Sequence, residues 1–117
     1  MKKKLTFTSE INSELENAHL ARQSGNEGKA RVCARRAAGI AVRNYFLETS
    51  KGEQIKSSFE LIRIFSEQPG LPPEIKKIAS NLTLRVTKSF DLPEGVDLIE
   101  DAQKLCNYLS NIKNQPF

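Results

Sequence analysis

The chain has 117 residues, a formal net charge of +4, and 38% hydrophobic and 27% charged residues. This length fits one domain, and a chain of this size buries roughly two-thirds of its unfolded surface, enough for a core without disulfides or metals. The apolar content and the mixed charge signs exclude an intrinsically disordered chain. No apolar run approaches the ~20 residues of a membrane span, and no apolar segment follows the basic start as it would in a signal peptide. We therefore expect a cytoplasmic protein.

Five helices are expected, at about residues 9–24, 29–47, 58–67, 73–88 and 97–112. The first carries Ile11 and Leu15 at helical spacing and ends at a glycine-rich turn, residues 24–28. The second is rich in alanine. Ser57 and Glu60 form a capping box that opens the third helix.

Two further signals define the last two helices. Pro73 suits the first turn of the fourth helix, and Asp97 suits the cap of the fifth. No segment shows the sustained period-two alternation of a strand, and the loops between amphipathic helices are short. The sequence therefore predicts an all-α, single-domain, antiparallel up-and-down bundle of four to five helices.

The predicted second helix has two unlike faces. Small apolar residues gather within about 80° of Ala30 when each residue turns the helix by 100°, so a neighbouring helix can approach closely there. The other face carries four arginines with Val32, Gly39, Val42 and Phe46 between them. A solvated face usually carries both charge signs and fewer bulky apolar groups. We therefore take six residues as a candidate partner interface, the arginine face: Arg31, Arg35, Arg36, Val42, Arg43 and Phe46.

The segment from Leu15 to Phe46 resembles the opening helix pair of HEPN-domain proteins, a family of small helical bundles. The matching features are the Gly25-Asn26 turn, the alanine pattern between residues 30 and 41, and Arg43 before an apolar end. Residues 58–61, 71–74, 84–87 and 97–109 resemble the third helix, a proline-marked turn, an arginine-led segment and the closing helix of that family. The similarity covers most of the chain.

The resemblance implies an up-and-down bundle that is usually a homodimer and often pairs with a nucleotidyltransferase-type protein in a toxin–antitoxin module. Some family members cleave RNA with an arginine followed four to six residues later by histidine. In this chain the single histidine, His19, precedes every arginine, and residues 48–50, where a histidine would follow Arg43, are Glu, Thr and Ser. The resemblance is therefore to a branch without nuclease chemistry, and we expect no enzyme activity.

The glycine-rich turn also allows a second resemblance. Gly25-Asn26 followed by an alanine-patterned helix is similar to a tetratricopeptide helix pair. That architecture needs at least three stacked repeats, and the chain shows one copy.

Other candidate site residues have structural explanations. His19 stands alone, without a cysteine or a carboxylate pair nearby in the sequence. Cys33 and Cys106 lack a C-x-x-C spacing and fall on apolar helix faces, where a free cysteine packs as a small hydrophobe. The acidic residues between 91 and 101 lack the order of a calcium loop, and the glycines near Lys29 lack the phosphate-loop pattern. We therefore expect no catalytic, metal or cofactor-binding residues.

The arginine face leaves three interpretations. The structural one is that its arginines pair with glutamates of the first helix, Glu10, Glu14 and Glu16. The leading functional hypothesis is an interaction module that self-associates and docks to a protein partner, because interfaces favour arginine with aromatic residues. The alternative is sequence-independent RNA binding. An enzyme is the least favoured, and it would need a site assembled across a dimer.

Overall fold

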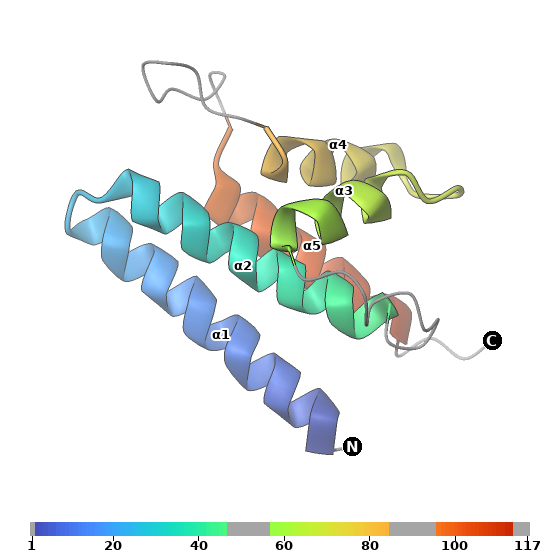
Figure 1. Cartoon of the computed structure of the whole chain (residues 1–117), viewed down its shortest axis with the longest axis horizontal. Coiled ribbons are helices and arrows are strands. Elements are labelled where there is room, and N and C mark those ends of the chain that lie inside the picture. Colours follow the sequence, from blue (N-terminus) through green and yellow to red (C-terminus); the bar gives the residue numbers. More distant parts are fainter. Residues whose placement is uncertain (1, 47–56, 85–95, 114–117) are drawn as a thin grey trace.

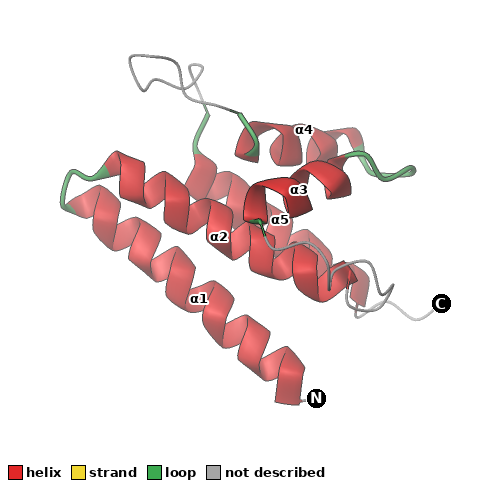
Figure 2. Ribbon diagram, in the orientation of Figure 1, coloured by secondary structure: helices red, strands yellow, loops and turns green. Residues whose placement is uncertain are grey.

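The computed structural model describes residues 2–46, 57–84 and 96–113, and the regular structure of these residues is helical throughout (Figures 1 and 2). The predicted all-α bundle is confirmed. Its helices are α1 (Lys2–Gln23), α2 (Glu27–Phe46), α3 (Ser58–Ser66), α4 (Pro73–Leu82) and α5 (Leu98–Lys113). None of the helices in the described ranges is long and apolar enough to cross a lipid bilayer.

Two helix boundaries differ from those predicted. The first helix begins at Lys2 rather than near residue 9, and residues 2–8 contain no glycine or proline that would interrupt it. The fourth ends at Leu82 rather than near residue 88. There the Thr83 hydroxyl donates to the carbonyl oxygens of Ala79 (3.3 Å) and Ser80 (3.0 Å), which satisfies acceptors of the last turn. Residues 85–88 lie outside the described residues.

The turn between α1 and α2 is the glycine turn that the sequence predicts. Gly25 has a φ of +84°, a conformation that a residue with a Cβ rarely adopts. Its amide donates to the Arg22 carbonyl (3.0 Å), and the Asn26 amide donates to the Ala21 carbonyl (2.8 Å), the pair of bonds that closes a helix with an αL residue. The Asn26 side chain then accepts from the Lys29 amide at 3.0 Å. This cap begins α2 at Glu27, slightly earlier than expected.

The other predicted caps are also present. Ser57 precedes α3, and its hydroxyl oxygen accepts from the Glu60 amide at 3.3 Å. Asp97 precedes α5, and its Oδ1 accepts from the amides of Ile99 (3.0 Å) and Glu100 (3.3 Å). Because such caps satisfy donors that the helix itself leaves open, they set where each helix begins.

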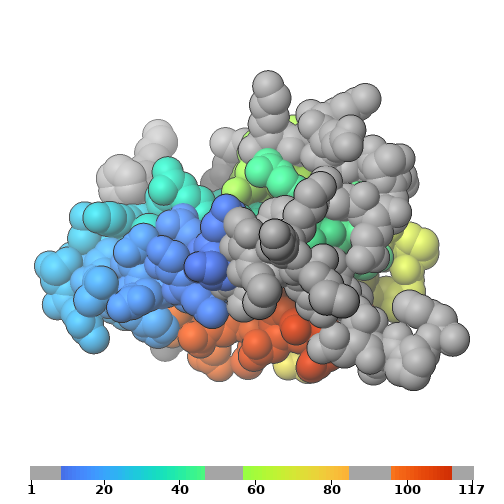
Figure 3. Space-filling view, turned by 90° about the horizontal axis from the view of Figure 1, so that it is seen from below, coloured from blue at the N-terminus to red at the C-terminus, as the bar shows by residue number. Residues whose placement is uncertain are grey.

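The central element of the bundle is α2, which packs against α1, α3 and α5 (Figure 1). Its alanine-rich face is buried as predicted: Ala30, Ala34, Ala37, Ala38 and Ala41 are 0–5% exposed. The Cys106 thiol of α5 donates to the Ala37 carbonyl at 3.7 Å, which places α5 along this small-residue face. Viewed from below, α1 lies across the front of the molecule with α5 beside it (Figure 3).

The direction of α5 departs from strict up-and-down order. Alternation through five helices would set α5 antiparallel to α2, but both run the same way, with their first residues at the same end of the bundle (Figure 1). The alternation is broken at α3, which begins at Gly39 and brings Phe65 to Tyr45, so it runs in the same direction as α2. The chain then returns along α4, whose last residue Leu82 lies at Arg35, and α5 begins near the start of α2.

Candidate interaction surface

Val42 and Phe46 of the arginine face lie in the hydrophobic core. Val42 is 0% exposed and Phe46 is 1% exposed, and both belong to the cluster that includes Leu61, Ile62 and Phe65 of α3. The Phe46 ring lies 5.4 Å from the Tyr45 ring, which in turn meets the edge of Phe65 at 5.7 Å. The prediction that these two residues belong to an exposed partner interface is therefore wrong, because α3 packs on this part of α2.

Gly39 explains how α3 reaches α2 so closely. A Cβ built at Gly39 would fall within 3 Å of the Ser58 side chain, which begins α3. No residue larger than glycine fits this contact without a shift. The helix start at Ser58 therefore rests directly on the backbone of α2, and the apolar residues on either side of Gly39 belong to an internal seam.

Arg35 has a structural partner within the chain. Its Nε donates to the carbonyl oxygen of Leu82, the last residue of α4, at 2.7 Å. The bond satisfies a carbonyl left open at the end of α4 and places a cation at the negative end of that helix. The side chain is half-buried, and burial lowers the pKa of its guanidinium. Arg35 therefore links α2 to α4, and the structure does not place it on an open surface.

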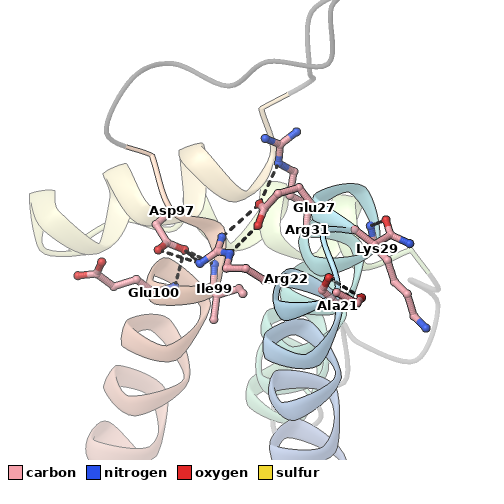
Figure 4. Close-up of polar contacts among 10 residues, drawn as sticks. Ala21, Arg22, Glu27, Lys29, Arg31, Asp97, Ile99 and Glu100 are labelled. Atoms are coloured by element: carbon pink, nitrogen blue, oxygen red, sulfur yellow. Dashed lines mark hydrogen bonds and ion pairs between the residues drawn. The ribbon is translucent and has the colours of Figure 1, made fainter.

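Arg31 is also largely covered, since its side chain is 21% exposed, and its Nε lies 4.0 Å from a Glu27 carboxylate oxygen. It belongs to a polar cluster at one end of the bundle that the sequence analysis missed (Figure 4). At the centre of that cluster, the Arg22 side chain lies between Glu27 at the start of α2 and Asp97 at the start of α5.

Arg22 holds three helix ends together. Its Nε donates to Glu27 at 2.6 Å, and its Nη1 donates to both carboxylate oxygens of Asp97 at 3.1 Å. The bond to Glu27, together with Asp97, raises the pKa of Arg22, and the same arginine lowers the pKa of Glu27. Burial opposes ionisation of Asp97, but the Glu100 amide and Arg22 outweigh it and hold that pKa below its ordinary value.

Arg36 is the exposed member of the arginine face. The Arg36 side chain is 63% exposed, and its Nη1 lies 3.9 Å from a Glu14 oxygen, at the limit of an ion pair. Arg43 is half-buried. The predicted pairing with glutamates of the first helix is thus present at Glu14, as a long contact with a mostly solvated arginine.

The exposed residues of α2 form a surface that differs from the predicted arginine face. Lys29, Val32 and Arg36 are exposed, and Arg43 continues the same line. Their positions span about 60° around the helix axis, so they form one row along α2. Val32 is 44% exposed, one of two large hydrophobic residues that the described chain leaves so open. We call this row the basic strip.

Among the described residues, the histidine and the two cysteines weighed from the sequence do not come together in a reactive site, and the acidic residues at 91 and 94 lie outside the described ranges. His19 is exposed, and its Nε2 lies 3.5 Å from the Gln103 side-chain nitrogen. Cys33 is buried, and burial raises the pKa of the Cys106 thiol to about 12, far from the thiolate state that reactivity needs. Among the described residues, no group of three or more histidine, cysteine or acidic side chains is placed to hold a metal ion.

A shallow depression of about 400 Å³ lies at the corner between α3 and α4. It is lined by Ser66, Pro73, Lys76, Lys77 and Ser80. None of these lining residues is buried, and the two lysines are exposed.

Comparison with known proteins adds no assignment to this geometry. No family model, curated protein or solved structure matches the chain.

Proposed function

We propose that this chain is a non-catalytic, HEPN-like interaction module that self-associates and docks to a protein partner. The observation that carries the proposal is the basic strip. Its exposed cations flank an exposed valine, which is the composition of a small protein interface with a charged rim. Arg36 is mostly solvated despite its long contact with Glu14, so its charge is available to a partner.

Two cations of the strip, Lys29 and Arg36, are not explained by the needs of α2 itself, whereas Arg43 lies in the last turn, where a cation stabilises the helix. Lys29 lies in the first turn of α2, where the positive end of the helix dipole makes a cation mildly unfavourable. Arg36 lies in the middle of α2, away from the negative end where a cation would stabilise the helix. Cations placed without benefit to the helix support a role in binding.

The kind of partner rests on the family resemblance. A HEPN-like module would form a homodimer and pair with a nucleotidyltransferase-type protein in a toxin–antitoxin-like pair. In that arrangement the basic strip would meet acidic side chains of the partner, and rim charges of this kind act mainly on the rate of association.

The test reverses the charge of the strip. Lys29→Glu with Arg36→Glu should weaken self-association in light scattering and should release the partner recovered from cells that contain the chain. Lys77→Glu, an exposed lysine on α4, is the matched control and should change neither. If the strip variant and the control behave like the wild type, the proposal is wrong.

RNA binding is the second candidate, and the density of cations on α2 favours it. No carboxylate occurs between Glu27 and Glu48 in the sequence. If the two exposed cations of the strip, Lys29 and Arg36, meet phosphates of a single strand, log K should fall with log salt with a slope of about −1.4. Salt-sensitive binding of a single-stranded RNA that is lost in the strip variant, with a monomeric wild type, would favour this function over protein docking.

The proposal includes no catalysis. Purified protein is expected not to cleave RNA, because a lone histidine offers no acid–base pair. His19 lies beside Gln103, which cannot serve as a second titrating group. Cleavage that disappears in His19→Ala would contradict this expectation and would point to a site assembled across two subunits.

A further inference from the structure

The basic strip follows a seven-residue repeat. Lys29, Arg36 and Arg43 are each seven positions apart, and Val32 lies three positions after the first of them. Seven residues turn an α-helix by almost two full turns, so the three cations face nearly the same way and lie about 10.5 Å apart along the axis. Apolar and charged residues at this spacing are typical of helix surfaces that pack along another helix.

From this spacing we infer that the partner presents an acidic α-helix to the strip, with carboxylates seven residues apart and an apolar side chain over Val32. The inference rests on the proposed docking function and specifies its partner. Two helices that cross at about 20° keep a seven-residue register over several turns. A partner helix with this repeat can therefore meet Lys29 and Arg36 with successive carboxylates.

The neighbouring contacts limit where that helix lies. Ser58 of α3 occupies the surface at Gly39, just beyond Arg36 on the same side of α2. Glu14 of α1 lies 3.9 Å from the Arg36 guanidinium. The open part of the strip is thus the first half of α2, from Lys29 to Arg36, with Val32 at its centre. This length matches about two turns of a partner helix.

Two synthetic peptides test the register. Both are alanine- and glutamine-rich helices of about 18 residues with identical composition, and they differ in the spacing of their glutamates. In one the glutamates are seven residues apart with leucine between them. In the other they are five residues apart and point to different sides of the helix. Binding is followed by fluorescence anisotropy at low and at moderate salt.

The peptide with the seven-residue repeat should bind the wild type about tenfold more tightly, a preference within reach of a few surface ion pairs. The preference should disappear in Lys29→Glu with Arg36→Glu and should persist in Lys77→Glu. Val32→Ala, an exposed substitution that leaves the core intact, should reduce binding of the repeat peptide and spare the other.

The outcomes separate this inference from the proposed function. Equal binding of both peptides, while the strip variant still releases the partner, would overturn the helical register and leave docking in place. If the strip variant also retains the partner and still self-associates, the docking function itself fails. Tighter binding of a single-stranded RNA than of either peptide would overturn the choice of an acidic helix.

Discussion

The two halves of α2 carry similar residues on one face but meet different surroundings. In the first half, Val32 and Arg36 are exposed and belong to the basic strip. In the second half, Val42 and Phe46 are buried under α3. The change occurs at Gly39, where the start of α3 rests on the helix backbone. One helix thus serves as core at one end and as surface at the other, and the boundary is set by a single close approach.

The test with the largest expected effect on stability truncates one apolar residue in each half of α2. Phe46→Ala should lower the free energy of unfolding by about 3–5 kcal/mol, because it leaves a large cavity in the core. Val32→Ala should change it by less than about 0.5 kcal/mol, as is usual for an exposed residue. Urea denaturation of both variants measures the difference. Equal losses at the two positions would show that the halves of α2 are not distinct.

Gly39→Ala tests the boundary itself. The new Cβ would lie within 3 Å of Ser58, and overpacking of this kind costs about 1–3 kcal/mol, more than the ~1 kcal/mol that alanine gains in helix propensity. Adding Ser58→Gly should restore part of the stability by clearing the contact. Gly28→Ala is the control, since its nearest neighbour is 3.8 Å away. A midpoint temperature of thermal unfolding that is higher for Gly39→Ala than for the wild type would contradict the close approach of Ser58 to α2.

Arg35→Met tests the claim that an arginine of the predicted interface has a structural role. The variant keeps much of the apolar stem and removes the bond to Leu82, so the loss should be about 1.5 kcal/mol, at the low end for a charged hydrogen bond. In this variant, amide hydrogen exchange should be accelerated more in α4 than in α1, because the lost bond is to the end of α4. If Arg36→Met is instead the more destabilising of the two, the roles assigned to these adjacent arginines are reversed.

The smallest expected effect is a pH dependence at the Arg22 cluster. Folding lowers the pKa values of Glu27 and Asp97, so their ion pairs stabilise the fold above the ordinary carboxyl pKa of about 4, and this contribution is lost as the pH falls through the lowered values. Burial raises the pKa of Asp101, which acts in the opposite direction.

The partly exposed ion pairs of this cluster should contribute at most about 1 kcal/mol. Arg22→Gln should therefore unfold with a flatter dependence on pH between about 5 and 3 than the wild type. Urea midpoints across that range provide the measurement. A wild-type curve and a variant curve that stay parallel would mean that Arg22 does not stabilise the two carboxylates.

Local patterns predicted most of the helices and caps. The alanine face of α2, the Gly25 turn and the Asp97 cap each depend on residues close in the sequence, so periodicity and capping chemistry were sufficient. The early end of α4 was missed because the Thr83 hydroxyl bonds are a weak signal within a continuing apolar pattern.

The candidate site was harder to predict, because helical periodicity shows which residues share a face but not what covers that face. A signal was present in Gly39, Val42 and Phe46, which form their own row at three- and four-residue steps and could have indicated a second buried side. Arg22 was missed for a different reason. Its partner Asp97 lies 75 positions away, and no local pattern connects them.

The Arg22 cluster also bears on the order of folding. Glu27 is five positions from Arg22, so their bond forms within the α1–α2 hairpin, whereas the bond to Asp97 must wait until α5 arrives from 75 positions away. Local contacts cost less loop-closure entropy, so the hairpin is expected in the transition state, with α5 docking later. Glu27→Gln should then slow folding, while Asp97→Asn should mainly speed unfolding. One side chain would thus report on an early and a late step of the same reaction.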